Sequence, residues 1–155
     1  MNELVEKLTA LKEAGDYEGI AEVIPYARWL GLAYEEQAGR LLGKLAYSDM
    51  IVGNPILPAL HGGTLGALLE STAIFEVMWR QESLVLPKTI NLTVDFLRSA
   101  RPVDTWATAT ITKRGRRVVA VRAVAWQEDE SRLVATANAH FLVMAQEKET
   151  EEAGQ

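Results

Sequence analysis

One segment of the chain constrains the fold more than any other. From Leu60 to Trp79 the sequence is LHGGTLGALLESTAIFEVMW, and apolar residues occupy nearly every side of a helix drawn through it. This pattern is typical of a helix that other parts of the protein surround. Glu70 places a charge inside the run, where an unpaired carboxylate is expensive to bury. The segment therefore predicts a long central helix that begins between Leu60 and Gly63 and carries a functional carboxylate.

Strand patterns follow this helix. Residues 89–96, TINLTVDF, alternate polar and apolar side chains with a period of two, which predicts a half-buried strand. Three further strand-like segments follow, TWATATITK, VVAVRAVAW and RLVATANAHFLV, separated by the turns KRGRR and QEDES. We expect these four strands to form an antiparallel meander. A sheet wrapped around one apolar helix is the hot-dog architecture, an α+β fold.

The segments before the central helix are less regular. Residues 2–14 carry leucines at helical spacing and stop at Gly15, and YEGIAEVI predicts a second short helix that Pro25 ends. Residues 26–49 suggest one or two strands, and residues 50–63 a loop. The predicted organisation is an N-terminal helical extension (1–27), a hot-dog domain (28–145) and a charged, disordered tail (146–155).

Composition excludes several classes of function. The chain has 155 residues, of which 48% are hydrophobic, and this suits one globular domain. It has no cysteine, only the histidines His61 and His140, and a net charge of −5, so we expect no disulfide, no metal site and no nucleic-acid partner. The N-terminus MNELVEKL is acidic, and no apolar run reaches the roughly 18 residues of a membrane span. A cytoplasmic protein without a membrane partner is expected.

The start of the central helix offers a second functional group. Backbone amides at a helix N-terminus lack intrahelical partners and carry partial positive charge, so those of Gly62 and Gly63 can receive a carbonyl oxygen that becomes an oxyanion. Glu70 is suited to attack the carbon of that carbonyl group or to deprotonate a water molecule that does so. The eight residues from Gly62 to Glu70 span about 12 Å along a helix. One subunit can hardly bring both groups to a single carbonyl. In a homodimer with antiparallel helices, however, Gly62 of one subunit lies near Glu70 of the other. We therefore expect at least a homodimer, alone or within a dimer of dimers.

These residues also carry a family resemblance. HGGTLGALLE, after an asparagine-bearing loop and before VDFLRSA, resembles the hot-dog acyl-CoA thioesterases of the phenylacetate-pathway (PaaI-like) group, over roughly residues 49–143. The resemblance implies hydrolysis of an aryl- or short- to medium-chain acyl-CoA, with no cofactor other than the CoA of the substrate. It also implies catalytic roles: Gly62 supplies the oxyanion amide, Glu70 is the nucleophile or general base, Asn54 positions the thioester or water, and Thr89 orients water.

Several candidate residues have a structural interpretation beside the functional one. Asn54 precedes a proline and is as well explained as a turn former. His61 and Gly63 are candidates for substrate binding, although a histidine at a helix start more often holds the local backbone. Arg116 and Arg117 in KRGRR either hold the CoA phosphates or form a solvated hairpin tip.

Two other functions compete with hydrolysis. A hot-dog protein that binds acyl-CoA without turning it over would use the same groove. A hot-dog dehydratase would pair the helix acid with a histidine well upstream, and the loop SDMIVGNPILPA contains none.

Overall fold

The computed structural model describes residues 2–82 and 84–143, so the predicted tail, residues 146–155, lies outside the described residues. The helices and strands follow in this order: α1 (Asn2–Ala14), α2 (Tyr17–Val23), α3 (Pro25–Leu30), β1 (Leu32–Gln37), β2 (Arg40–Leu45), the 3-10 helix η1 (Asp49–Ile51), β3 (Val52–Asn54), β4 (Ala59–Leu60), α4 (Gly62–Trp79), β5 (Lys88–Phe96), β6 (Thr105–Arg114), β7 (Val118–Trp126) and β8 (Ala135–Leu142).

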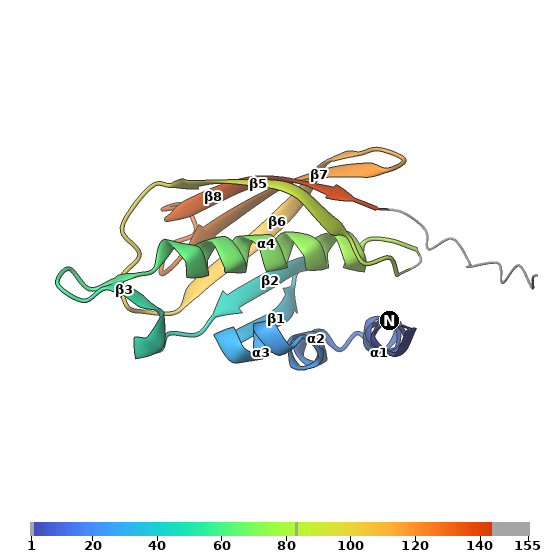
Figure 1. Ribbon diagram of the computed structural model, residues 1–155, viewed down its shortest axis with the longest axis horizontal. Coiled ribbons are helices and arrows are strands. Elements are labelled where there is room, and N and C mark those ends of the chain that lie inside the picture. The colour runs from blue at the N-terminus through green and yellow to red at the C-terminus, as the bar shows by residue number, and fades with distance from the viewer. Residues whose placement is uncertain (1, 83, 144–155) are drawn as a thin grey trace, which may run out of the picture.

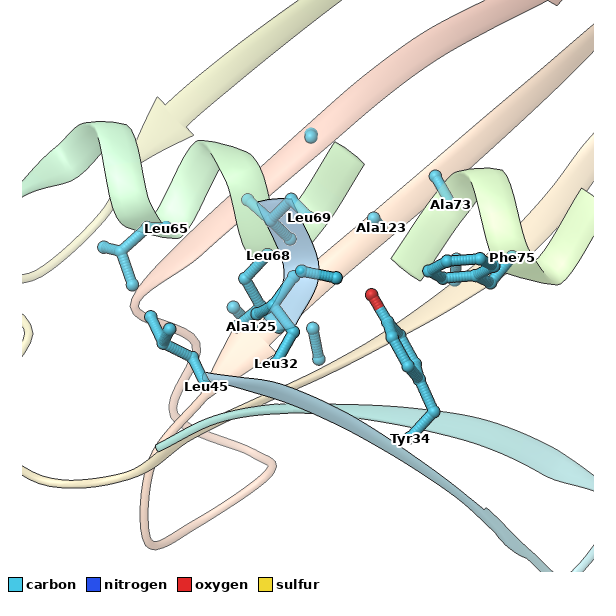
Figure 2. Close-up of a cluster of buried hydrophobic side chains, with 14 of the residues drawn as sticks. Leu32, Tyr34, Leu45, Leu65, Leu68, Leu69, Ala73, Phe75, Ala123 and Ala125 are labelled. Atoms are coloured by element: carbon cyan, nitrogen blue, oxygen red, sulfur yellow. The ribbon is translucent and has the colours of Figure 1, made fainter. Parts of the chain in front are cut away.

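The predicted central helix is α4, and an antiparallel sheet curves around it (Figure 1). The side of α4 that faces the sheet is fully buried, and Figure 2 shows its leucines and Phe75 beside side chains of β1, β2 and β7. Tyr34 of β1 also points toward α4 and packs edge-on against Phe75, with ring centroids 4.5 Å apart. Burial raises the pKa of the Tyr34 phenol, so this side chain stays neutral inside the core. The prediction of an α+β hot-dog fold is confirmed.

The predicted strand order is wrong in one respect. The six-stranded sheet has the order β1-β2-β6-β7-β8-β5, so β6, β7 and β8 form a meander but β5 lies at the edge beside β8. A short turn joins β6 to β7, and residues 127–134 join β7 to β8, which also pair. Residues 97–104 instead carry the chain from β5 past β8 and β7, so that β6 pairs with β7 and β2. As an edge strand, β5 is also more exposed than the half-buried strand predicted.

The segment after Pro25 is helical at first, which corrects the prediction of strand. Pro25 ends α2 and also occupies the first position of α3, where its missing N–H costs nothing. Gly31 then ends α3 in the left-handed conformation, at φ 76°. The two predicted strands start only at β1. The predicted boundary at residue 27 falls inside α3.

The N-terminal helices are tied to the end of α4. The Lys12 ammonium donates hydrogen bonds to the carbonyl oxygens of Met78, at 3.3 Å, and Gln81. A cation is favourable there because carbonyl groups at a helix C-terminus carry partial negative charge. Tyr17 packs on Trp79 with ring centroids 4.2 Å apart. The extension therefore packs as part of the body of the protein.

Candidate active site

The predicted site residues Gly62 and Glu70, with Gly66 between them, lie along one stripe of α4 that faces β5. A side chain at Gly62 would bring its Cβ to 3.0 Å from the ring of Phe96, and one at Gly66 to 4.0 Å from Val94. Glu70 follows Gly66 by four residues and therefore lies on the same side of the helix. A side chain would therefore crowd the Phe96 ring at Gly62, whereas at Gly66 a methyl group would lie at ordinary contact distance from β5.

Glu70 is half-buried and has a hydrogen-bond partner on β5. The Thr89 hydroxyl donates to its carboxylate Oε1 at 2.7 Å. Glu70 is thus less enclosed than a helix apolar on every side led us to expect, because the Gly62–Glu70 stripe is the partly open side of α4. Glu70 and Thr89 were separate candidates in the sequence, and the fold brings them into contact.

A β-bulge makes this contact possible. Strand β5 pairs Asn91 with His140 and Thr89 with Phe141, which leaves Ile90 as an extra residue between them. Phe141 is fully buried on the helix side of the sheet, whereas Asn91 and His140 lie exposed on the other side, with 2.9 Å between Asn91 Oδ1 and His140 Nδ1. The bulge therefore turns Thr89 to the inner face, against the regular alternation, and bulges commonly re-aim a side chain beside an active site.

The two candidate backbone amides at the start of α4, those of Gly62 and Gly63, differ in their hydrogen bonding. His61 is the N-cap residue, and its Nδ1 accepts a hydrogen bond from the Gly63 amide at 2.9 Å. The Gly63 amide therefore already has a hydrogen-bond partner within the chain, so of the two predicted amides Gly62 is the better placed to receive a substrate oxygen. The Gly62 amide forms no hydrogen bond within residues 2–82 and 84–143. Gly62 instead lines an open cavity of about 440 Å³ together with Phe96 and Arg98.

Asn54 has the turn-forming role that competed with a catalytic one. Its side-chain oxygen accepts hydrogen bonds from the amides of Ile56 and Leu57, at 3.0 and 3.1 Å. This holds the turn between β3 and β4, which protrudes at the end of the molecule where α4 begins (Figure 1). The side-chain oxygen of Asn54 therefore already accepts two hydrogen bonds within the turn.

Arg116 and Arg117 of KRGRR lie in the exposed turn between β6 and β7. The Val143 amide donates to the Arg117 carbonyl at 2.8 Å, and Leu142 pairs with Val118 on one side and Lys88 on the other. The turn therefore lies at the same end of the sheet as Thr89, two strands away, or about 10 Å at ordinary strand spacing.

A second cavity, of about 260 Å³, flanks the first turn of α4, and no residue of β5 lines it. Its walls include His61, Gly63 and Thr64 from the helix start and the aromatic side chains of Tyr26 and Trp29 from α3. These aromatic residues were not among the predicted site residues, because the segment was expected to form a strand. The signal was present, since PYARWLG has proline and glycine at the two positions that open and close a helix.

Other site types find no support in the described part of the chain. Residues 2–82 and 84–143 contain no group of three or more histidine, aspartate or glutamate side chains placed to hold a metal ion. Over the same residues, no helix combines the length and apolar character needed to cross a membrane.

Comparison with known proteins identifies the family to which the chain belongs. The model of the thioesterase superfamily matches residues 57–134, which include α4, β5, β6 and β7. The chain belongs to the thioesterase superfamily, and the prediction of a thioester hydrolase of the hot-dog fold is confirmed.

Individual relatives agree with this assignment. A crystal structure of a Chromobacterium violaceum protein is 36% identical, with a TM-score of 0.74, and the match covers 95% of this chain and 100% of that one. A phenylacetic acid degradation-related putative thioesterase from Ralstonia eutropha is 31% identical over 77% of this chain and 91% of its own, with a TM-score of 0.68. The medium/long-chain acyl-CoA thioesterase YigI of Salmonella typhimurium is 29% identical over 77% of this chain and 86% of its own length. The PaaI-like resemblance noted in the sequence is confirmed.

Proposed function

We propose that this protein hydrolyses acyl-CoA thioesters to a free acid and CoA. The observation that carries the proposal is the 2.7 Å hydrogen bond from Thr89 to Glu70, which fixes a carboxylate on the same helix stripe as the unpartnered Gly62 amide. The name of the Salmonella relative, a medium/long-chain acyl-CoA thioesterase, supports CoA esters as the substrate class. Medium acyl chains agree both with that name and with the short- to medium-chain expectation from sequence.

In the proposed reaction, Glu70 acts as a general base. Thr89 occupies Oε1, so Oε2 is available to accept a proton from water. The water oxygen attacks the thioester carbon, Glu70 takes the proton, and the carbonyl oxygen becomes an oxyanion that the Gly62 amide stabilises. Collapse of this intermediate breaks the C–S bond, and the CoA thiolate leaves and takes up a proton. Direct attack by Glu70, through an acyl anhydride that water then hydrolyses, uses the same groups.

The proposed site is shared between two subunits. Within one chain, Gly62 and Glu70 lie about 12 Å apart along the helix axis. Strand β5 offers a surface for a second copy, since it is a sheet edge and exposes apolar side chains: Ile90 and Phe96, and Leu97 just after the strand, are all more than half exposed. Unpaired edges and exposed apolar patches of this kind favour association. In a two-fold pair with antiparallel α4 helices, each Gly62 amide faces the partner's Glu70.

Thr89 is a positioning residue in this scheme, and its hydroxyl can be tested alone. We expect Thr89→Val to lower kcat roughly tenfold to hundredfold, because a hydrogen bond to a charged group is worth about 1.5–3 kcal/mol, and to leave KM within about threefold. Thr89→Ser keeps the hydroxyl and should restore most of the rate. Steady-state kinetics on one acyl-CoA measures both. Equal rates for the valine and serine variants would remove Thr89 from the mechanism.

The basic turn between β6 and β7 is proposed to hold the phosphates of CoA. Arginine pairs well with phosphate, and the turn lies about 10 Å from Thr89 across the sheet. The double change Arg116→Ala and Arg117→Ala is expected to raise KM about tenfold for an acyl-CoA and less than twofold for the same acyl group on pantetheine, which lacks those phosphates. An equal rise for both substrates would show that the turn does not bind phosphate.

A further inference from the structure

We propose that the 260 Å³ cavity beside the start of α4 binds the hydrocarbon chain of the acyl group, and that α3 thereby sets the preferred chain length. The inference rests on the proposed function and names the part of the substrate that this cavity receives. Helix α3 precedes the residues that the family model matches, 57–134, so the family assignment does not itself assign the cavity a role.

The walls of the cavity match an apolar chain. The side chains of Tyr26, Trp29 and Met50 are 54%, 67% and 76% exposed, an unusual amount of apolar surface to leave in water at one place. Tyr26 and Trp29 stack with ring centroids 5.8 Å apart and so present one broad aromatic surface. Buried Leu30 and Ile51 complete the apolar lining. None of the residues lining the cavity is acidic, lysine or arginine, which leaves it unsuited to the phosphates of CoA.

The position of the cavity matches a group attached to the reacting carbonyl. His61, Gly63 and Thr64 form one wall, and they flank the Gly62 amide that is proposed to hold the carbonyl oxygen. The cavity that Gly62 itself lines is on the β5 side of the same helical turn and carries Arg98. A thioester carbonyl carries two groups, the hydrocarbon chain of the acyl group and the sulfur of CoA. The hydrocarbon chain fits the aromatic cavity, whereas the polar and charged CoA group fits the β5 side of the helix and the basic turn.

Two substitutions change the cavity in different ways without touching the catalytic groups. Trp29→Ala removes an exposed aromatic wall, and Ser48→Phe adds a ring to a lining position. Tyr47→Ala is the control for the first, because Tyr47 is an exposed aromatic residue of the neighbouring segment that does not line the cavity. Ser131→Phe, in the turn before β8, is the control for the second.

The measurement is kcat/KM for butanoyl-, octanoyl- and dodecanoyl-CoA. For wild type we expect a rise of roughly fourfold for each methylene group that enters the cavity. Trp29→Ala and Ser48→Phe should each lower kcat/KM for dodecanoyl-CoA at least tenfold and leave that for butanoyl-CoA within twofold, and the two controls should keep the wild-type profile. Unchanged chain-length profiles in both cavity variants would overturn the inference.

A binding measurement separates this inference from the proposed hydrolysis. The thioethers S-dodecyl-CoA and S-butyl-CoA cannot be hydrolysed, so the ratio of their Kd values reports chain binding even if the protein cleaves no thioester. The cavity assignment is supported if S-dodecyl-CoA binds wild type at least tenfold more tightly than S-butyl-CoA does, and if Trp29→Ala reduces this difference. A ratio near one in wild type overturns it. A Trp29→Ala protein that becomes monomeric and loses activity equally at all chain lengths would also overturn it, because the aromatic surface would then be a subunit contact.

Discussion

Replacing Glu70 with glutamine is expected to lower kcat for acyl-CoA hydrolysis at least a hundredfold. Glutamine has nearly the same shape and can still accept the hydrogen bond from Thr89, but it cannot take a proton from water or attack the thioester carbon. Loss of an acid–base group typically reduces the rate by roughly 10²–10⁴. The rate is followed by the release of free CoA thiol. Thermal unfolding should show a Tm close to that of wild type, because the half-buried side chain keeps its volume.

Glu76→Gln is the matched control on the same helix. Glu76 is buried and pairs with Arg80 at 2.8 Å, away from the Gly62–Glu70 stripe. The change should lower Tm, because it removes one partner of a partly buried ion pair, yet keep kcat within about threefold. A Glu70→Gln protein with kcat within a few fold of wild type would refute the assigned role. A variant that binds acyl-CoA as tightly as wild type, when wild type itself shows no hydrolysis, would favour the acyl-CoA-binding alternative.

Mixing two inactive variants should restore about a quarter of wild-type activity if the site is shared between subunits. Glu70→Gln lacks the carboxylate, and Gly62→Pro lacks the amide hydrogen. After subunit exchange, half of the dimers are mixed, and each mixed dimer carries one site with both defects and one site with neither. Activity is measured on the exchanged mixture, with exchange followed by mass spectrometry of tagged chains.

The structure makes Gly62→Pro a practical variant. Gly62 is the first residue of α4, a position that proline favours, and His61 before it has φ −65° and ψ 129°, which a following proline accepts. The added atoms would meet the Phe96 ring, which is more than half exposed and free to move. Gly62→Ala makes the same contact but keeps the amide, so it should retain activity within about tenfold. No recovery in a demonstrated mixed dimer of folded chains would mean that acid and amide do not act across the interface.

The central features of the protein followed from local sequence. A run that is apolar on nearly every side is stable only when most of it is enclosed, so the long helix and a sheet around it were predictable from the sequence of residues 60–142. HGG at the start of that helix and Glu70 eight residues later named both halves of the candidate site. Period-two alternation located the strands, because the pleat places successive side chains on opposite faces.

Tertiary structure decided which partner each of these groups has. Strand order depends on pairing between segments distant in the chain, so the edge position of β5 was not encoded in its own pattern. The bulge at Ile90, which turns Thr89 toward Glu70, arises from the pairing of β5 with β8 and contradicts the simple alternation. Which of the adjacent Gly62 and Gly63 amides has a partner within the chain depends on where the His61 ring folds back, since its Nδ1 accepts a hydrogen bond from Gly63. Local patterns fix which residues are helical, extended or apolar, whereas hydrogen bonds between segments far apart in the chain form only when the whole chain is packed.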